Sequence, residues 1–438
     1  MFGNLYGKYN KDCIVYADTV EDEAVATIHN LLDCPAFANI PIRIMPDTHQ
    51  GKGIVIGFTA PIGNMICPSH VGVDIGCRMT TCLTDTNINP SEYALIEHKI
   101  RKEIPFGVKI HKTTQIDYKD FYRFMNNGLD RIRSLWPEMI DSCATCDEEG
   151  ISDLCQRIKM DEGKFYKSLG SVGGGNHFIE FGATPDGKYA FTIHCGSRNF
   201  GVKVCNYWEN IAKDALSKSE IKELTRSFKE EYQLQGKPMT EFKQALNSFL
   251  EEKKLHHING YLSGENMVGY ITDMAIAQLY AEYNHKVIEQ KIEAILKKVN
   301  GANVVDRIIS VHNYIDYQDH IIRKGAIRSY EGERMVIPFN MRDGLAICVG
   351  KSNQDWNYSA PHGAGRLLSR TKANNTLSLS EFVNQMKDVY STSVCKNTLD
   401  EAPNAYKPMA EILELIKPTC DVLYLIKPII NLKSTNGE

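Results

Sequence analysis

Toward its C-terminal end the chain reads Tyr358-Ser359-Ala360-Pro361-His362-Gly363-Ala364-Gly365-Arg366. A histidine stands among small residues and glycines here, and an arginine follows it four positions on. Glycine permits close backbone approach and unusual backbone angles, imidazole can be a covalent nucleophile, and guanidinium matches phosphate geometry. The stretch therefore favours a backbone that closes on a phosphate beside His362. A glycine turn before a helix, with an exposed histidine, also fits this stretch taken alone.

A helical block lies between the His362 stretch and most of the other segments in which polar residues and glycines stand together. Apolar residues at three-and-four spacing predict helices from about 204 to 298. Short apolar runs predict strands in residues 1–85 and at 191–194, 304–309 and 334–338. Because candidate site residues lie on both sides of the block, we predict a single α+β domain over residues 1–438. It would have mixed β-sheets and a mainly helical insertion at about 204–298.

The composition is that of an ordinary globular protein. The chain has 438 residues, of which 43% are hydrophobic and 24% charged. We see no signal peptide at the N-terminus and no run near the roughly 18 apolar residues of a membrane span. Thirteen scattered cysteines favour a reducing cytosol, so we expect a cytoplasmic protein with no membrane partner. The net charge of −4 means that any RNA partner would need a local basic surface.

Five residues have the chemistry of metal ligands. Asp74 and Cys77 flank a glycine, so that a turn can aim both side chains at one point. His177, His194 and His312 each follow or end an apolar stretch. Each histidine alone fits a hydrogen-bonded structural role, but together the five would fill two metal sites roughly 3.5–4 Å apart, an arrangement common in phosphoryl chemistry. Thiolate and imidazole ligands by themselves favour zinc.

Gly173-Gly174-Gly175 could present backbone N–H groups to phosphates, although no Walker A lysine follows. Asn176 and Glu180 then become candidates for nucleotide contact. A carboxylate can accept from two donors on guanine but from one on adenine, which weakly favours guanine for Glu180. A surface strand position fits Glu180 as well.

Three other patterns carry less weight. Cys143, Cys146 and Cys155 hint at a zinc clip, but no second close pair accompanies them. The charged stretch from Lys218 to Lys254 predicts a solvated helical pair. His256-His257 is expected to be exposed to solvent.

Taken in order, these segments resemble the RtcB family of RNA-splicing ligases, from about Met45 to Lys433. The matching motifs are Asp74-x-x-Cys77, Gly-Gly-Gly-Asn176-His177-Phe178-Ile179-Glu180, His194-x-Gly-Ser-Arg198, His312-Asn313, Arg323-Lys324-Gly325-Ala326, His362-Gly363-Ala364-Gly365-Arg366 and Asp400-Glu401-Ala402-Pro403-x-Ala405-Tyr406-Lys407.

The resemblance implies a GTP- and manganese-dependent ligase that joins RNA 3′-phosphate or 2′,3′-cyclic phosphate ends to 5′-hydroxyl ends, in RNA repair or tRNA splicing. His362 would form a covalent bond to GMP. Asp74, Cys77 and His177 would hold one Mn²⁺, and Cys77, His194 and His312 the other. An archease-like activator is a possible partner. The implied nucleotide contacts are Asn176, His177, Phe178, Ile179, Glu180, His312, Asn313, His362, Gly363, Ala364, Gly365 and Lys433.

One loop departs from the family pattern. Many members have proline-glycine-serine/threonine-methionine where this chain has Pro338, Phe339, Asn340 and Met341. These four residues are further candidates for nucleotide contact, and the change leaves strict preference for GTP open. Candidates for RNA phosphate contact are Arg198 and Arg366, together with Arg370, Lys52, Arg323 and Lys324.

Two other functions remain open at this point. A dinuclear phosphoesterase could use the same ligands to activate water, and it would need neither nucleotide nor His362. A non-catalytic RNA-end-binding protein would tolerate the altered loop at Phe339-Asn340.

Overall fold

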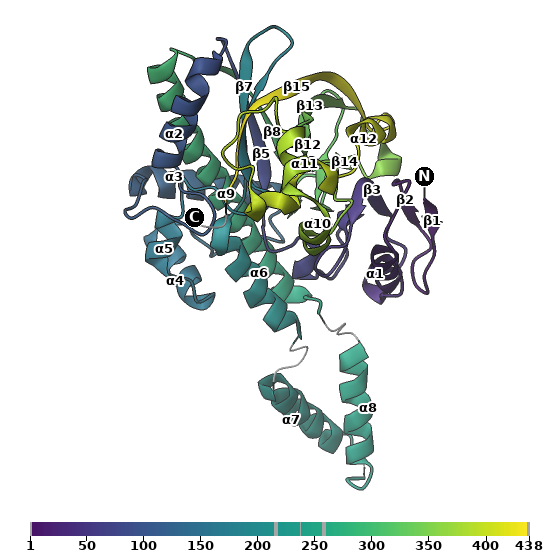
Figure 1. The fold of residues 1–438 in the computed structure, drawn as a ribbon. Coiled ribbons are helices and arrows are strands. Elements are labelled where there is room, and N and C mark those ends of the chain that lie inside the picture. Colours follow the sequence, from purple (N-terminus) through teal and green to yellow (C-terminus); the bar gives the residue numbers. More distant parts are fainter. Residues whose placement is uncertain (1, 214–217, 237, 256–259, 436–438) are drawn as a thin grey trace.

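The computed structural model describes residues 2–213, 218–236, 238–255 and 260–435. Its largest sheet is antiparallel, with the strand order β12-β13-β15-β6-β7-β5-β8 (Figure 1). Its strands are β5 (Arg78–Thr84), β6 (Phe178–Ala183), β7 (Tyr189–Cys195), β8 (Val304–Val311), β12 (Arg334–Asn340), β13 (Gly344–Gly350) and β15 (Cys420–Leu432). The sheet curls until its two edges meet, since the Val336 amide donates to Ser310 Oγ at 2.8 Å.

A second sheet has the order β1-β2-β3-β4-β10-β9. Its strands are β1 (Gly3–Leu5), β2 (Cys13–Val15), β3 (Ile42–His49), β4 (Ile56–Pro61), β9 (Tyr314–Ile315) and β10 (Ile321–Lys324). A two-stranded ribbon, β11 (Ala326–Arg328) with β14 (Ser359–Pro361), lies beside it. Chain segments far apart in sequence therefore pair within both large sheets, β4 with β10 and β6 with β15.

Helix α9 (Gly264–Val299) is buried over most of its length because its sequence is apolar on nearly every face. It contacts α2, α3, α6 and β7. Aspartates cap α3, α4 and α5: Asp117, Asp147 and Asp161 each accept a backbone N–H. The other helices are α1 (Asp22–Leu32), α2 (Tyr93–Glu103), α3 (Tyr118–Leu135), α4 (Glu148–Arg157), α5 (Glu162–Lys167), α6 (Arg198–Lys213), α10 (Arg370–Thr376), α11 (Leu379–Gln385) and α12 (Met409–Leu415). Short 3-10 helices are η1 (Pro35–Phe37), η2 (Pro68–His70), η3 (Pro90–Glu92), η4 (Gln354–Trp356), η5 (Lys396–Glu401) and η6 (Pro403–Ala405).

Helices α7 (Lys218–Leu234) and α8 (Phe242–Leu255) pack on each other and project away from the sheets (Figure 1). Phe228 and Phe249 stack between them, with ring centroids 4.4 Å apart. Both helices were expected from the charged stretch, whereas His256 and His257 lie outside the described residues. The predicted insertion at about 204–298 runs from α6 to α9. Of these helices, α6 and α9 pack into the core, and α7 and α8 project from it (Figure 1). The insertion as a unit stays a prediction.

The α+β class is confirmed, and the strands expected at 191–194, 304–309 and 334–338 lie within β7, β8 and β12. Within the described residues, no metal-competent group includes Cys143, Cys146 or Cys155, so the zinc clip finds no support. In the same part of the chain, no helix is both long and apolar enough to cross a membrane.

Candidate metal centre and nucleotide cavity

The predicted ligands meet at one edge of the large sheet. Cys77 directly precedes β5, His177 directly precedes β6, His194 lies near the end of β7, and His312 directly follows β8. Neighbouring strands run antiparallel, so strand beginnings and strand ends alternate along this edge. The register brings His194 opposite both Phe178 and Met79. The topology thus gathers side chains that are more than 200 positions apart in the sequence.

Two overlapping three-residue groups form there, and Cys77 belongs to both. Asp74, Cys77 and His177 make one group, and Cys77, His194 and His312 the other, with the potential ligand atoms of each within 4.8 Å of one another. Cys77 Sγ lies 3.4 Å from Nε2 of both His177 and His194. His194 Nε2 lies 3.3 Å from His312 Nε2, and His177 Nε2 lies 2.8 Å from Asp74 Oδ2.

The separations of 3.3–3.4 Å among Cys77, His177, His194 and His312 fit bound metal ions, whereas the 2.8 Å between His177 and Asp74 is that of a hydrogen bond. Metal–ligand bonds of about 2.0–2.3 Å in a tetrahedral site place neighbouring ligand atoms roughly 3.5 Å apart. The carbonyl oxygen of Asn176 accepts from His194 Nδ1 at 3.1 Å, which leaves Nε2 as the ligand nitrogen. The donor set therefore suits two ions that share the sulfur of Cys77.

Charge within the cluster is unevenly distributed. Burial opposes ionisation of Asp74, but the adjacent His177 outweighs it and lowers the pKa of Asp74 to about 2. Burial likewise opposes protonation of His177, but Asp74 outweighs it and raises the pKa of His177 to about 9. Burial and the neighbouring histidines lower the pKa values of His194 and His312 well below the ordinary value. The last two imidazoles are thus neutral, which is the form that binds metals.

His362 lies beside this cluster at the end of β14. Its ring centroid is 4.7 Å from that of His312. Its Nδ1 lies 2.7 Å from Oδ2 of Asp47, a fully buried carboxyl group on β3. When Asp47 accepts the Nδ1 hydrogen, Nε2 keeps the free lone pair. Gly365 allows the close approach because a Cβ there would lie 2.1 Å from the Asp47 carbonyl oxygen.

A cavity of about 550 Å³ opens beside the cluster and His362. Most of the expected nucleotide contacts line it, and His177 and Ile179 do not. The lining residues that were expected to contact nucleotide are Asn176, Phe178, Glu180, His312, Asn313, Pro338, Phe339, Asn340, Met341, His362, Gly363, Ala364, Gly365 and Lys433. Their roles as nucleotide contacts stay predictions.

Glu180 is buried rather than on the surface. Its Oε2 accepts from Asn431 Nδ2 at 2.7 Å, and burial raises the pKa of Glu180 to about 8. Both residues line the cavity. A carboxyl group in this position can donate or accept, depending on what enters.

Glu401 organises the cationic wall of the cavity. Its carboxylate lies 3.2 Å from Arg366 Nη1, 3.1 Å from Arg370 Nη1 and 3.1 Å from Lys433 Nζ. Tyr406 also donates its hydroxyl to Glu401, at 2.6 Å. One buried carboxylate thus gathers three cations, which leaves local positive charge in the cavity wall.

Three of the candidates for RNA phosphate contact can be reached from solvent or from the cavity. Arg366, Arg370 and the exposed Lys52 are reachable, although each is ion-paired. Arg198 donates to Ser171 Oγ and the Gly107 carbonyl, and it does not line the cavity.

Arg323 and Lys324 are buried, which contradicts their suggested RNA contact. Arg323 binds Asp316 and Asp319, and Lys324 donates to the Lys52 and Ser69 carbonyls. A motif alone does not reveal whether a basic side chain points inward.

The loop that departs from the family pattern closes one side of the cavity. The amide of Ala364 donates to the Pro338 carbonyl at 3.0 Å, which ties the His362 segment to β12. Asn340 turns its amide to Asp343 at 2.7 Å and accepts from two backbone amides. Asn340 therefore shapes the β12–β13 turn, and Phe339 and Met341 add apolar lining.

Sequence reasoning assigned no role to Asp47 or Glu401. Glu401 lies in the Asp400–Lys407 motif of the family resemblance, and Asp47 lies two residues after Met45, where the resemblance begins. The resemblance was the available signal, but the pairing with His362 or with the cations depends on the fold.

A sequence model of the family described as tRNA-splicing ligase RtcB matches residues 28–434. The chain belongs to the RtcB family. RNA-splicing ligase RtcB of Escherichia coli (strain K12) is 27% identical over 412 residues, covering 90% of each chain. tRNA-splicing ligase RtcB of Aeropyrum pernix is 24% identical over 467 residues, covering 92% of this chain and 90% of the relative. RNA-splicing ligase RtcB homolog 1 of Entamoeba histolytica is 26% identical over 430 residues, covering 84% of this chain and 76% of the relative.

Family membership confirms the resemblance noted from the motifs. The family match covers residues 28–434. It includes every residue that lines the cavity except Glu21. The ligand cluster, His362 and the cationic wall therefore lie within the region that the RtcB family shares.

Proposed function

We propose that the protein is an RNA ligase that joins RNA 3′-phosphate or 2′,3′-cyclic phosphate ends to 5′-hydroxyl ends, using GTP and a covalent histidine–GMP intermediate. The observation that carries this proposal is the position of His362. Asp47 orients its imidazole at 2.7 Å, and the ring opens into the cavity beside two metal-competent groups. Covalent nucleotidyl transfer requires an oriented imidazole with a free ring nitrogen, whereas the phosphoesterase alternative predicts only a modest loss of activity in His362→Ala.

In the first step, His362 Nε2 attacks the α-phosphorus of GTP. An N–P bond forms, the bond to the bridging oxygen breaks, and pyrophosphate leaves. Asp47 holds the Nδ1 hydrogen throughout, and it stabilises the positive charge that develops on the ring. The cationic wall around Glu401 suits the negative charge of the phosphates.

The second step passes the guanylyl group to RNA. An oxygen of the RNA 3′-phosphate attacks the same phosphorus, the N–P bond breaks, and His362 is restored. The RNA 5′-hydroxyl then attacks the activated 3′-phosphate and expels GMP, which forms the phosphodiester. A 2′,3′-cyclic end must first add water to become a 3′-monophosphate.

Asp74, Cys77 and His177 would hold one metal ion, and Cys77, His194 and His312 the other. Bound there, the ions would neutralise phosphate charge and orient the reacting groups. The resemblance implies manganese, whereas thiolate and imidazole ligands alone also suit zinc.

Covalent labelling tests the proposal. The purified protein is incubated with α-phosphate-labelled GTP and Mn²⁺, in parallel with the His362→Ala variant. The control variant His29→Ala removes an exposed histidine in α1, far from His362 in the sequence. An acid-labile adduct in the wild type and in His29→Ala, lost in His362→Ala, is the expected result. No adduct with GTP or ATP under varied metals would overturn it.

Ligation of RNA oligonucleotides separates the alternatives. Joining of 3′-phosphate to 5′-hydroxyl ends is expected only when nucleotide is added. Phosphate release without nucleotide would favour the phosphoesterase, and RNA binding without either reaction would favour an end-binding protein. Running the assay with and without an archease-like protein tests the expected activator.

A further inference from the structure

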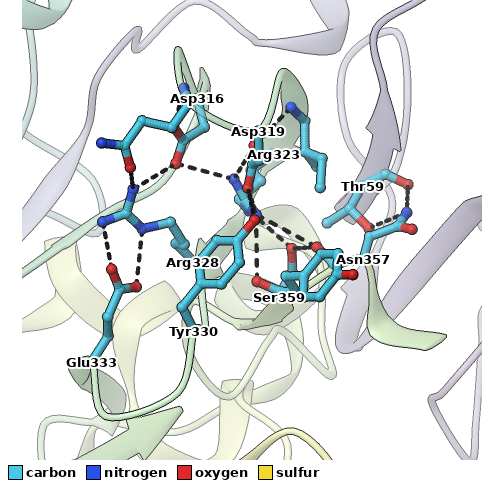
Figure 2. A network of polar contacts seen from close by, with 12 residues as sticks. Thr59, Asp316, Asp319, Arg323, Arg328, Tyr330, Glu333, Asn357 and Ser359 are labelled. Atoms are coloured by element: carbon cyan, nitrogen blue, oxygen red, sulfur yellow. Dashed lines mark hydrogen bonds and ion pairs between the residues drawn. The ribbon is translucent and has the colours of Figure 1, made fainter. Parts of the chain in front are cut away.

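Arg323, at the end of β10, has a guanidinium group with no solvent exposure. Figure 2 shows it at the centre of a polar network. Its Nη2 lies 2.6 Å from Asp319 Oδ2, and its Nη1 lies 3.4 Å from Asp316 Oδ2. Two carboxylates thus offset the cost of burying this charge.

The same guanidinium also faces the chain segment that leads to His362. Nε of Arg323 donates to Ser359 Oγ at 2.9 Å. Its Nη2 donates to the carbonyls of Tyr358 at 3.4 Å and Asn357 at 3.5 Å (Figure 2). One planar group therefore reaches three consecutive residues, Asn357, Tyr358 and Ser359, the last of which begins β14.

That segment has an unfavourable backbone. Asn357 and Tyr358 both have φ of 49°, in the left-handed region, which is unfavourable for a bulky L-residue such as Tyr358. The Asn357 amide donates to Pro41 O at 3.1 Å and to Thr59 Oγ1 at 3.2 Å. Contacts from three sides hold a conformation that the segment would not keep alone.

We propose that Arg323 is a positioning residue for His362, because it fixes the strained turn from which β14 extends; this rests on the proposed role of His362 as nucleophile. Ser359 lies three residues before His362, and β14 is only three residues long. A shift of the turn would therefore move the imidazole relative to Asp47 and the cavity. Misplacement of a reacting group by about 1 Å can lower a rate about 100-fold.

The outer half of the network offers a matched control. Arg328 lies 3.2 Å from Asp316 Oδ2 and 2.5 Å from Glu333 Oε1, and it also donates to Gln318 Oε1. Arg328 shares Asp316 with Arg323, yet none of its side-chain hydrogen bonds reaches residues 357–359. Its backbone pairs with Ser359 in the β11–β14 ladder, and a change of side chain leaves this pairing in place. Arg328→Lys therefore perturbs the same network while keeping the hydrogen bonds of Arg323 to the turn.

The experiment compares Arg323→Lys, Arg328→Lys and the wild type. Lysine keeps the charge but cannot donate at once to Ser359, two carbonyls and two carboxylates. We expect the rate constant for guanylylation of His362 to fall about ten-fold or more in Arg323→Lys, with half-saturating GTP within about two-fold of the wild type. Arg328→Lys should stay within about two-fold in both quantities.

A second readout needs no nucleotide. Carbethoxylation of His362 by diethyl pyrocarbonate, followed by mass spectrometry of its peptide, should become faster in Arg323→Lys and stay unchanged in Arg328→Lys. If Arg323→Lys does not fold, Ser359→Ala keeps both ion pairs and should show a smaller loss in the same direction. Thermal melting of each variant measures the purely structural effect.

The outcomes separate this inference from the proposed function. Absence of labelling in the wild type contradicts the function, and the carbethoxylation comparison still tests the positioning role. Normal labelling and carbethoxylation in folded Arg323→Lys and Ser359→Ala would overturn the positioning role of Arg323. Equal losses in Arg323→Lys and Arg328→Lys would also overturn it, because the effect would then belong to the network as a whole.

Discussion

His362 Nδ1 and Asp47 Oδ2 lie 2.7 Å apart, although 315 positions separate the two residues in the sequence. Asp47 is on β3 in the six-stranded sheet, and His362 follows β14 in the two-stranded ribbon. The pair thus joins two separate sheets, and His362 lines the cavity. Its geometry gives His362 one defined tautomer, which a nucleophilic imidazole requires.

Asp47→Asn should therefore impair guanylylation while preserving the fold. Asparagine has nearly the same shape, but it cannot stabilise a positive imidazole as a carboxylate does. We expect the labelling rate to fall by about 100-fold or more, in line with the loss of orienting carboxylates elsewhere. Glu21→Gln, which alters another carboxylate at the cavity without a hydrogen bond to His362, should keep most of the rate. A normal rate in Asp47→Asn would contradict the orienting role.

The sequence named the residues that meet at the candidate metal cluster, because Asp74 and Cys77 flank a glycine and three histidines follow or end apolar runs. It also predicted the α+β class, since strand and helix periodicities occupy separate regions. Burial was harder to predict. Arg323 and Lys324 have the composition of an RNA contact, yet buried carboxylates and carbonyls engage them. The partners of a long polar side chain depend on contacts that no local pattern records.

Cys77 belongs to both metal-competent groups, and this predicts how metal content responds to mutation. Cys77→Ala should lose both ions, whereas His177→Ala or His312→Ala should lose mainly one. Equilibrium dialysis against Mn²⁺ or Zn²⁺, with metal analysis of the protein, measures the stoichiometry without any activity assay. Cys143→Ala removes an exposed thiol and should leave the metal content unchanged. Full retention of one ion by Cys77→Ala would contradict a shared sulfur.

Glu180 should make folding stability depend on pH. Burial raises the pKa of its carboxyl group from 4.5 to about 8, so the folded chain binds this proton more tightly than the unfolded chain. Its contribution therefore favours folding at low pH and is lost as the pH rises from about 4.5 to about 8. Glu180→Gln should gain stability relative to the wild type across this window, measured by urea unfolding at several pH values. A difference that stays constant with pH would contradict the assignment.

The same Glu180 carboxyl group tests nucleotide choice. If it accepts hydrogen bonds from guanine, Glu180→Gln should weaken GTP binding and leave ATP binding nearly unchanged. The loss is expected to be about 1–3 kcal/mol, the cost of one mismatched polar contact. Calorimetric titration of both nucleotides measures it. Equal weakening for GTP and ATP would place Glu180 outside base recognition.

Glu401 provides the strongest test of the cationic wall. Burial opposes its ionisation, but the charges of Lys433, Arg370 and Arg366 outweigh that effect and lower the pKa of Glu401 to about 2. Its contribution to stability is therefore present above about pH 4.5 and is lost as the pH falls toward 2.

Glu401→Gln leaves Lys433 buried without its carboxylate, so we expect a loss of about 3–5 kcal/mol at neutral pH. Glu414→Gln removes an exposed carboxylate paired with Lys417 and should cost less than about 1 kcal/mol. Urea unfolding of both variants at pH 7 and at pH 3 measures these differences, and the Glu401 difference should narrow at the lower pH. A Glu401→Gln variant as stable as Glu414→Gln at pH 7 would show that the three cations do not depend on this carboxylate.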